Sequence, residues 1–240
     1  MTQKNVYEDG VRAASYATLE FPGTYSLAFR DLPALISAHV RGARALDFGC
    51  GAGRSTRFLK VLGLEVVGVD VSAEMVEHAR SRDVSGDYRL IEDGGLGHFP
   101  QPAFDLVLSA FTFDNVGGFD KKLLLLRQIA ALLFPGGRFV NLVSTPEIYV
   151  NEWASFTTKD FPENRKARSG DPVKIVMIDV EDRRPVVDIV CSDEDYRKLY
   201  DLAGLALLET HKPLARPEES RDWVSETRIA PWVLYVLGKQ

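Results

Sequence analysis

The chain has 240 residues, of which 45% are hydrophobic and 26% charged, and its formal net charge is −5. This composition is typical of a globular protein, and the acidic balance makes nucleic acid a poor candidate partner. The N-terminus lacks the apolar region of a signal peptide, and no stretch approaches the roughly 18 apolar residues of a membrane span, so we expect neither secretion nor membrane insertion.

Short apolar runs alternate with amphipathic stretches from residue 44 onward, the pattern of a parallel sheet covered by helices. This pattern predicts five strands, at residues 44–48, 65–69, 88–91, 104–110 and 138–143. Helices are predicted between them at residues 55–62, 72–80 and 121–133. The stretch Phe134-Pro135-Gly136-Gly137 predicts a tight turn before the fifth strand. We therefore expect a doubly wound α/β sheet.

The pattern changes after Pro146, where the chain becomes polar and aromatic. Residues 173–180 and 185–191 are predicted to form an antiparallel hairpin that is inserted into the sheet. A last helix at 192–204 and strands at 205–210 and 231–237 follow. We interpret the chain as one domain, with an N-terminal helical cap (1–43), a ligand-binding core (44–145), the inserted hairpin or lid (146–191) and the final helix and strands (192–240).

A glycine-rich loop, Asp47-Phe48-Gly49-Cys50-Gly51-Ala52-Gly53, joins the first strand to a helix. Glycines let backbone N–H groups and a helix N-terminus approach a ligand with no side chains in the way. The second strand ends in Asp70, a position from which a carboxylate accepts hydrogen bonds from both ribose hydroxyls. These features predict a nucleoside site. A tight strand–helix turn with a capping aspartate is the alternative that needs no ligand.

The spacing of the glycines indicates which nucleoside is bound. A pyrophosphate-binding turn usually reads G-x-G-x-x-G, whereas this loop reads G-x-G-x-G and follows an acid, Asp47. An aspartate repels a pyrophosphate but attracts a ligand that carries an ammonium and a sulfonium group. S-adenosylmethionine is such a ligand and has no phosphate. An NAD-type oxidoreductase is therefore the weaker alternative.

Three stretches together resemble class I S-adenosylmethionine-dependent methyltransferases: residues 46–53, residues 69–75, and Phe104-Asp105-Leu106-Val107 ahead of Phe134-Pro135-Gly136-Gly137. The resemblance covers about residues 45–144. It implies a Rossmann-like sheet of about seven strands, mostly parallel with an antiparallel last strand, and S-adenosylmethionine as cofactor with S-adenosylhomocysteine as product.

The resemblance also implies which residues bind the cofactor. They are Asp47, Phe48, Gly49, Cys50, Gly51 and Gly53 at the methionine end, Asp70 at the ribose, Val71 and Met75 beside the adenine, Asp93 and Gly94 at the adenine amino group and ring, Ala110 after the fourth strand, and Tyr16. Two departures from the family pattern are visible. Leu96-Gly97-His98-Phe99-Pro100 replaces the usual apolar-Pro-Phe run, and Glu8 stands between Tyr7 and Tyr16 where the family has Asp.

The expected reaction is transfer of a methyl group to nitrogen or oxygen of a small-molecule acceptor. Positioning alone supplies up to roughly 7–11 kcal/mol of barrier reduction, so a dedicated base is optional. The candidates for a base or orienting group are His211 and Asp114, and His98 and Tyr149 are further candidates. A module that binds the nucleoside without turnover is a further alternative.

Aromatic residues are the candidates for contact with the acceptor: Phe111 and Phe113 after the fourth strand, and Trp153 and Phe156 in the insertion. A small satellite core under a long loop is the alternative for the aromatic insertion. The two cysteines, Cys50 and Cys191, lack metal-ligand spacing, so we expect free thiols, a cytoplasmic location and no metal site. A homodimer is compatible with the sequence.

Overall fold

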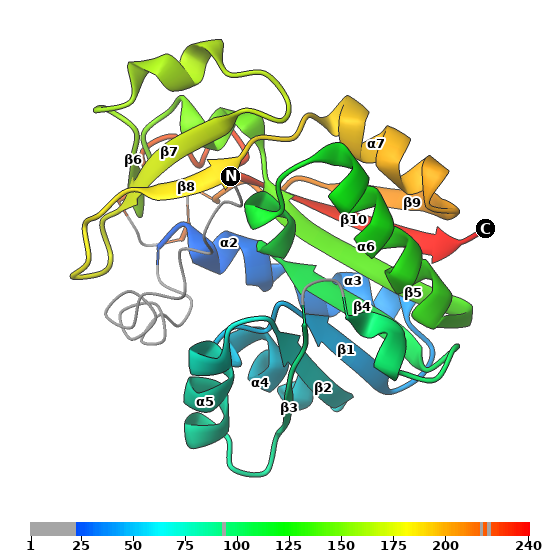
Figure 1. Cartoon of the computed structure of the whole chain (residues 1–240). Helices are drawn as coiled ribbons and strands as arrows, with labels where there is room; N and C mark the ends of the chain where they lie inside the picture. The colour runs from blue at the N-terminus through cyan, green and yellow to red at the C-terminus, as the bar shows by residue number, and fades with distance from the viewer. Residues whose placement is uncertain (1–22, 93–94, 217, 220–221) are drawn as a thin grey trace.

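The computed structural model describes residues 23–92, 95–216, 218–219 and 222–240 (Figure 1). Its main element is a seven-stranded sheet with the strand order β3-β2-β1-β4-β5-β10-β9. The strands are β1 (Arg44–Phe48), β2 (Glu65–Asp70), β3 (Asp87–Leu90), β4 (Phe104–Ala110), β5 (Leu133–Ser144), β9 (Leu205–His211) and β10 (Trp232–Lys239). All neighbours pair in parallel except β10, which is antiparallel to both β5 and β9. This confirms the predicted fold class.

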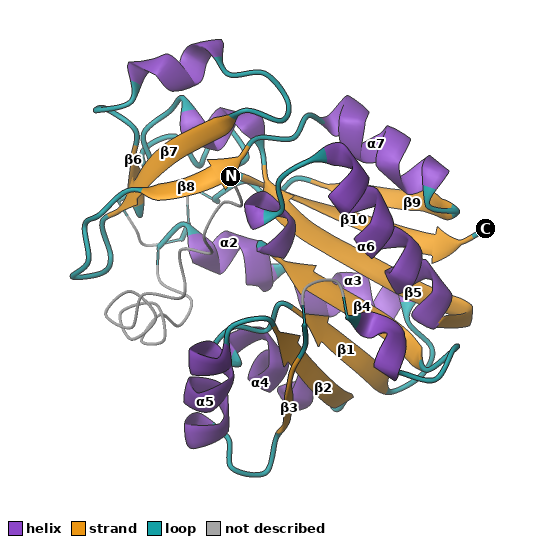
Figure 2. Ribbon diagram, in the orientation of Figure 1, coloured by secondary structure: helices purple, strands orange, loops and turns teal. Residues whose placement is uncertain are grey.

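Helices cover both faces of the sheet, as Figure 2 shows. They are α2 (Tyr25–Arg30), α3 (Leu32–His39), α4 (Arg54–Val61), α5 (Ala73–Arg82), α6 (Phe119–Leu132) and α7 (Asp193–Leu202). The N-caps of α5 and α7 are serines, in agreement with the sequence pattern. Ser72 Oγ accepts a hydrogen bond from Met75 N at 3.3 Å, and Ser192 Oγ accepts one from Asp195 N at 3.1 Å.

Two hydrophobic cores lie on opposite faces of the sheet because strand residues alternate in direction. Leu106 and Leu108 of β4 pack in the core that includes α2, α3 and the inserted segment. Val107 points the other way, into the core formed with α6 and α7. Burial of each such side chain stabilises the fold by about 1.5–3 kcal/mol.

The direction of β10 determines which edge of the sheet its first residue reaches. Because β10 is antiparallel to β5, that residue, Trp232, pairs with Ser144, the last residue of β5. Trp232 therefore lies at the carboxyl edge of the parallel strands, where open α/β sheets bind their ligands.

The insertion folds as a second, three-stranded antiparallel sheet, which we call the lid sheet: β6 (Phe156–Thr157), β7 (Pro172–Met177) and β8 (Val186–Ile189). Figure 1 shows it beyond the end of β5, beside α2. The hairpin of β7 and β8 was predicted, whereas the short strand β6 was not. The 3-10 turns η4 (Pro146–Tyr149) and η5 (Pro162–Lys166) connect its parts.

Hydrogen bonds fix the lid sheet to α2. Thr24 N donates to Ser155 Oγ at 2.8 Å, and Ser155 N donates to Thr24 Oγ1 at 3.1 Å. The fully buried Glu226 accepts from Thr24 Oγ1 at 2.6 Å and from Ala154 N at 2.7 Å. Trp232 Nε1 donates to Thr24 O at 2.9 Å. The lid sheet is therefore joined to the rest of the domain through buried polar contacts.

The predicted boundary before the fifth strand was wrong. β5 begins at Leu133, which pairs with Phe104, and the register then shifts so that Leu106 pairs with Arg138. The Pro-Gly-Gly stretch is an irregularity within β5, where Gly136 has a φ of +83°. No helix in the described part of the chain is long and apolar enough to cross a membrane.

Candidate functional site

The glycine loop lies at the carboxyl end of β1 and has three glycines with positive φ: Gly49 (+77°), Gly51 (+51°) and Gly53 (+81°). A Cβ on Gly49 would lie 2.1 Å from Thr112 Oγ1, and a Cβ on Gly53 would lie 2.7 Å from Tyr88 OH. At Gly51 the nearest atom is Met75 Cε, at an ordinary 3.5 Å. Neighbouring side chains therefore exclude Cβ atoms at the outer glycines, whereas the space over Gly51 is open to a ligand.

The amide groups of the loop differ from the expectation, because several of them already donate within the protein. Gly49 N and Cys50 N donate to Val69 O, Gly51 N donates to Asp70 Oδ2, and Gly53 N donates to Cys50 O, at 2.8–2.9 Å. A phosphate needs several free donors at such a turn. In this loop, which lies between Asp47 and Asp70, several of the N–H donors are already used within the protein. The arrangement therefore fits a ligand without phosphate.

Asp47 at the end of β1 is fully buried. Its Oδ2 accepts hydrogen bonds from Ser55 Oγ and Thr56 Oγ1, both at 2.6 Å, while its Oδ1 has no partner among the described residues. Burial raises the pKa of this carboxyl to about 6. An unpartnered buried acceptor of this kind is completed by a positive group, so Asp47 fits the ammonium end of S-adenosylmethionine.

Asp70 at the end of β2 is held by two backbone donors. Gly51 N donates to its Oδ2 at 2.8 Å and Ser72 N to its Oδ1 at 2.9 Å. Burial raises the pKa of this carboxyl. Each oxygen keeps a lone pair for a ribose hydroxyl. Val71, the next residue, is 48% exposed, and Met75 is buried with its Cε 3.5 Å from the position of a Cβ on Gly51. Their place beside the adenine stays a prediction.

Three of the remaining cofactor candidates have side chains that are buried or partly buried. The side chain of Phe48 is buried 6.0 Å from the ring of Phe113, in the core under α6. The thiol of Cys50 is buried in a small cluster with Val76, Ala79 and Tyr88. Ala110 is partly buried at the end of β4. Tyr7, Tyr16, Asp93 and Gly94 lie outside the described residues.

A pocket lies between the carboxyl edge of the large sheet and the lid sheet. Four aromatic residues from distant parts of the chain form its apolar walls: Tyr25, Phe111, Phe156 and Trp232. Trp232 stacks on Tyr25 at 5.6 Å and meets Phe111 and Phe156 edge-on at 4.7 and 5.7 Å. Its polar lining is Asp114, Asn115, Ser144, Tyr149 and Asp188.

Two contacts place this pocket beside the glycine loop. Thr112 Oγ1, next to Phe111, donates to Phe48 O at 2.9 Å. The guanidinium of Arg54, next to Gly53, lies 5.0 Å from the centre of the Tyr25 ring. Phe111 has a φ of +63°, which a residue with a side chain rarely adopts, and such strain concentrates at functional sites.

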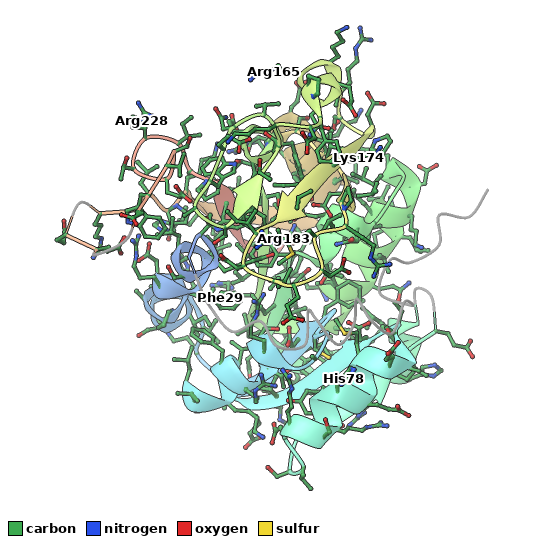
Figure 3. All side chains as sticks on the ribbon, turned by 90° about the vertical axis from the view of Figure 1, so that its left-hand side faces the viewer. Phe29, His78, Arg165, Lys174, Arg183 and Arg228 are labelled. Carbon is green, nitrogen blue, oxygen red and sulfur yellow. The ribbon has the colours of Figure 1, made fainter. Side chains whose placement is uncertain are left out.

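Figure 3 looks onto this edge of the molecule. Arg183, on the loop between β7 and β8, lies in that view between Lys174 of β7 and His78 of α5. The loop between β7 and β8 extends to the left in Figure 1, the side that faces the viewer in Figure 3.

The structure brings together four of the residues proposed for the acceptor side: Asp114, Tyr149, Phe111 and Phe156 all line the pocket. Two of the predicted aromatics are elsewhere. Phe113 is fully buried between Phe48 and Phe139. Trp153 is buried in the lid, where its Nε1 donates to Ile148 O at 2.8 Å. Both are core residues rather than acceptor contacts.

The two histidines proposed as bases are not at the pocket. His211 is at the end of the edge strand β9, and its Nε2 lies 2.9 Å from Asp31 Oδ2 in a surface cluster with Arg30. His98 is exposed in the 3-10 turn η2 (Leu96–His98). Neither side chain lines the pocket.

Among the pocket residues that were missed are Tyr25, Trp232 and Asp188. The sequence does carry a signal for Asp188, which is the one acid in the apolar run Val186-Val187-Asp188-Ile189-Val190 and shares the buried face of β8 with Val186. A charge on the buried face of a strand is a candidate functional residue. Nothing near Tyr25 or Trp232 in the sequence marks them as pocket residues.

Comparison with known proteins matches part of the chain to a family. A family model described as a methyltransferase domain matches residues 46–141. N-demethylindolmycin N-methyltransferase of Streptomyces griseus is 26% identical over 200 residues, which is 82% of this chain and 83% of the relative. A ubiquinone biosynthesis O-methyltransferase of Bradyrhizobium sp. is 38% identical over 124 residues. That match spans 49% of this chain and less than half (44%) of the relative.

Solved structures share the fold. The CcbJ methyltransferase from Streptomyces caelestis superposes with a TM-score of 0.65 at 20% identity, over 92% of this chain and 100% of that one. A putative S-adenosylmethionine-dependent methyltransferase from Listeria monocytogenes superposes with a TM-score of 0.62 at 16% identity, over 97% and 100%. Residues 46–141 thus match a methyltransferase domain, and the chain has the fold of these methyltransferases. The matched region includes the loop at the end of β1 and its two acids, and the findings support S-adenosylmethionine as the cofactor.

Proposed function

We propose that this enzyme transfers the methyl group to nitrogen or oxygen of a small-molecule acceptor bound in the aromatic pocket. The observation that carries the proposal is the position of the pocket. It lies at the carboxyl edge of β4 and β5, next to the glycine loop, and is closed on its other side by the lid sheet.

In this proposal each part of the site has a defined role. Asp47 binds the ammonium end of the cofactor, Asp70 binds the ribose, and the open face of Gly51 admits the cofactor. The bound cofactor supplies an electrophilic methyl group. Phe111 and Phe156 position the acceptor and exclude water, and the barrier falls mainly because the two reactants are held together.

The names of relatives support a small acceptor. The Streptomyces griseus relative, which aligns over most of both chains, is named an N-methyltransferase of N-demethylindolmycin. The Bradyrhizobium relative is named an O-methyltransferase of ubiquinone biosynthesis. The two names differ in the atom that is methylated, so they leave both nitrogen and oxygen in the proposal.

Two measurements test this function. Calorimetric titration with S-adenosylmethionine, S-adenosylhomocysteine and NAD should show binding of the first two and none of NAD. Incubation with label-bearing cofactor and metabolite extracts should then transfer label to a small molecule. Label found only in protein or nucleic acid would refute the small-molecule acceptor, and cofactor binding with no transfer to any fraction would favour a binding module.

A further inference from the structure

Two buried carboxylates face the aromatic pocket, and their surroundings point to the charge of the acceptor. Asp114 is 4% exposed and accepts hydrogen bonds from Ser144 N at 3.0 Å and Ser144 Oγ at 2.7 Å. Asp188 is 8% exposed and accepts one from Tyr149 OH at 3.0 Å. Their elements, η3 (Thr112–Asn115) and β8, pack against each other. The pocket thus contains two acids on adjacent walls.

No cation of the described chain neutralises this pair within the pocket. Lys122 of α6 is the cation that acts on both acids, but its ammonium donates to Phe113 O and lies 5.5 Å from the Tyr196 ring, outside the pocket lining. The thiol of Cys191 and the hydroxyl of Tyr196 lie near the same cluster, and burial raises the pKa of both. A single cation outside the pocket lining leaves one of the two buried acids without a counter-charge, and that acid is costly to keep charged unless a ligand supplies the positive charge.

The walls of the pocket are suited to the same charge. Aromatic faces carry negative potential and attract a cation that is held within about 6 Å of the ring centre. Tyr25, Phe111, Phe156 and Trp232 line the same pocket as Asp114 and Asp188. An alcohol or phenol, which is neutral when it binds, gains nothing from the second acid. An ammonium group gains from both acids and from the rings.

On the basis of the proposed function, we propose that the acceptor is an aliphatic amine on an apolar body, which enters as an ammonium ion and gives a proton to Asp188 before it is methylated. In this step the N–H bond breaks, an O–H bond forms on the Asp188 carboxylate, and the nitrogen regains its lone pair. The nitrogen then forms a bond to the methyl carbon as the methyl–sulfur bond breaks, and the sulfur keeps the electron pair. The product is the N-methylated ammonium ion.

The contacts of the two acids assign different roles to them. Ser144 donates twice to Asp114 and so favours its charged form, whereas Asp188 receives one hydrogen bond and is repelled by Asp114. Burial first, and the charge of Asp114 second, raise the pKa of Asp188. A base works best when its pKa lies near the working pH. Asp188 is therefore the proton acceptor and Asp114 the fixed counter-charge.

Calorimetry without cofactor tests the inference independently of turnover. Phenethylamine and phenethyl alcohol are titrated into the protein at pH 7.5 in two buffers of different ionisation enthalpy. The amine should bind about tenfold or more tighter than the alcohol, the difference expected of at least one cation–π or charged contact. Its binding should release protons, because burial and Asp114 raise the pKa of Asp188 in the empty pocket and an ammonium beside the carboxyl lowers that pKa again.

The Asp188→Asn variant tests the role of the carboxylate, since an amide oxygen still accepts from Tyr149 OH. It should lose the proton release and most of the preference for the amine, while the exposed Asp160→Asn variant behaves as the wild type. Equal affinity for amine and alcohol, failure of the amine to bind, or unchanged proton release in Asp188→Asn would overturn the inference. The proposed function would still stand if S-adenosylmethionine binds and label reaches a phenol or alcohol.

Discussion

The open space over Gly51 gives a direct test of the cofactor site. In the Gly51→Ala variant the new methyl group meets only Met75 Cε, at 3.5 Å, so there is no steric cost within the protein. The backbone cost of a side chain at a φ of +51° remains and is about 1–2 kcal/mol. For a domain of this size it corresponds to a fall in Tm of about 2–8 °C. The methyl group would also occupy the space assigned to the cofactor.

Gly63 provides a matched control, since its φ is +86° and no atom lies within 4 Å of a Cβ placed there. In Gly63→Ala the free energy of unfolding should fall by the same amount, roughly 1–2 kcal/mol, through backbone strain alone. This variant should bind S-adenosylmethionine as the wild type does. Gly51→Ala should in addition weaken binding by about 1–3 kcal/mol, or roughly five- to 150-fold in Kd.

The assay has two parts, thermal unfolding without ligand and calorimetric titration with S-adenosylmethionine. Gly49→Ala completes the series. Its Cβ would lie 2.1 Å from Thr112 Oγ1, so it should lose more stability than either other variant. If Gly51→Ala binds the cofactor as tightly as Gly63→Ala does, the loop is not the cofactor site and the reasoning from the open glycine is wrong.

Three further predictions address the other parts of the site. Asp70→Ala should weaken the binding of S-adenosylmethionine by about 1.5–3 kcal/mol for each ribose hydrogen bond lost. Unchanged affinity in a calorimetric titration would show that Asp70 does not bind the ribose. Phe156→Leu should raise the KM for the acceptor and leave cofactor affinity within a few-fold. Trp153→Phe, which leaves Ile148 O without its donor, should lose about 1–3 kcal/mol of stability with KM unchanged, and the reverse pattern would restore Trp153 as an acceptor contact. The folded pKa of Asp188, about 8, lies above its unfolded value, so its contribution to stability is full at low pH and is lost as the pH rises from about 4 to 8. The free energy of unfolding of Asp188→Asn should therefore exceed that of the wild type by an amount that grows across this pH window. A difference that stays constant with pH would contradict the prediction.

The cofactor half of the site was predictable because its signals are local. Asp47, the three glycines and Asp70 lie within 24 consecutive residues, at the ends of two adjacent strands. Strand periodicity and turn chemistry place them without knowledge of the tertiary fold. What local pattern could not show is that the loop amides are satisfied within the protein, because the acceptors are Val69 O and Asp70 Oδ2, on the neighbouring strand.

The acceptor half was predicted only in part because its residues meet through the tertiary fold. Phe111 and Phe113 are two positions apart, yet the left-handed conformation at Phe111 turns one ring to the pocket and leaves the other in the core. His211 does follow a strand at the carboxyl edge, as expected. That strand, β9, is the outermost one and is separated from β5 by β10. The order of strands in a sheet cannot be predicted from local periodicity.

The bonds that join Thr24, Ser155, Glu226 and Trp232 have a consequence for the order in which the protein folds. They connect positions 131 to 208 residues apart, whereas the segment from Asp47 to Asp70 is short. Contacts that close long loops form late, because the chain loses its entropy on closing the loop before the favourable contacts can offset that loss. A folding chain should therefore complete the cofactor loop before the lid sheet docks. Pulse-labelling hydrogen exchange during refolding would then show protection of β1 and β2 ahead of β6 and the start of β10.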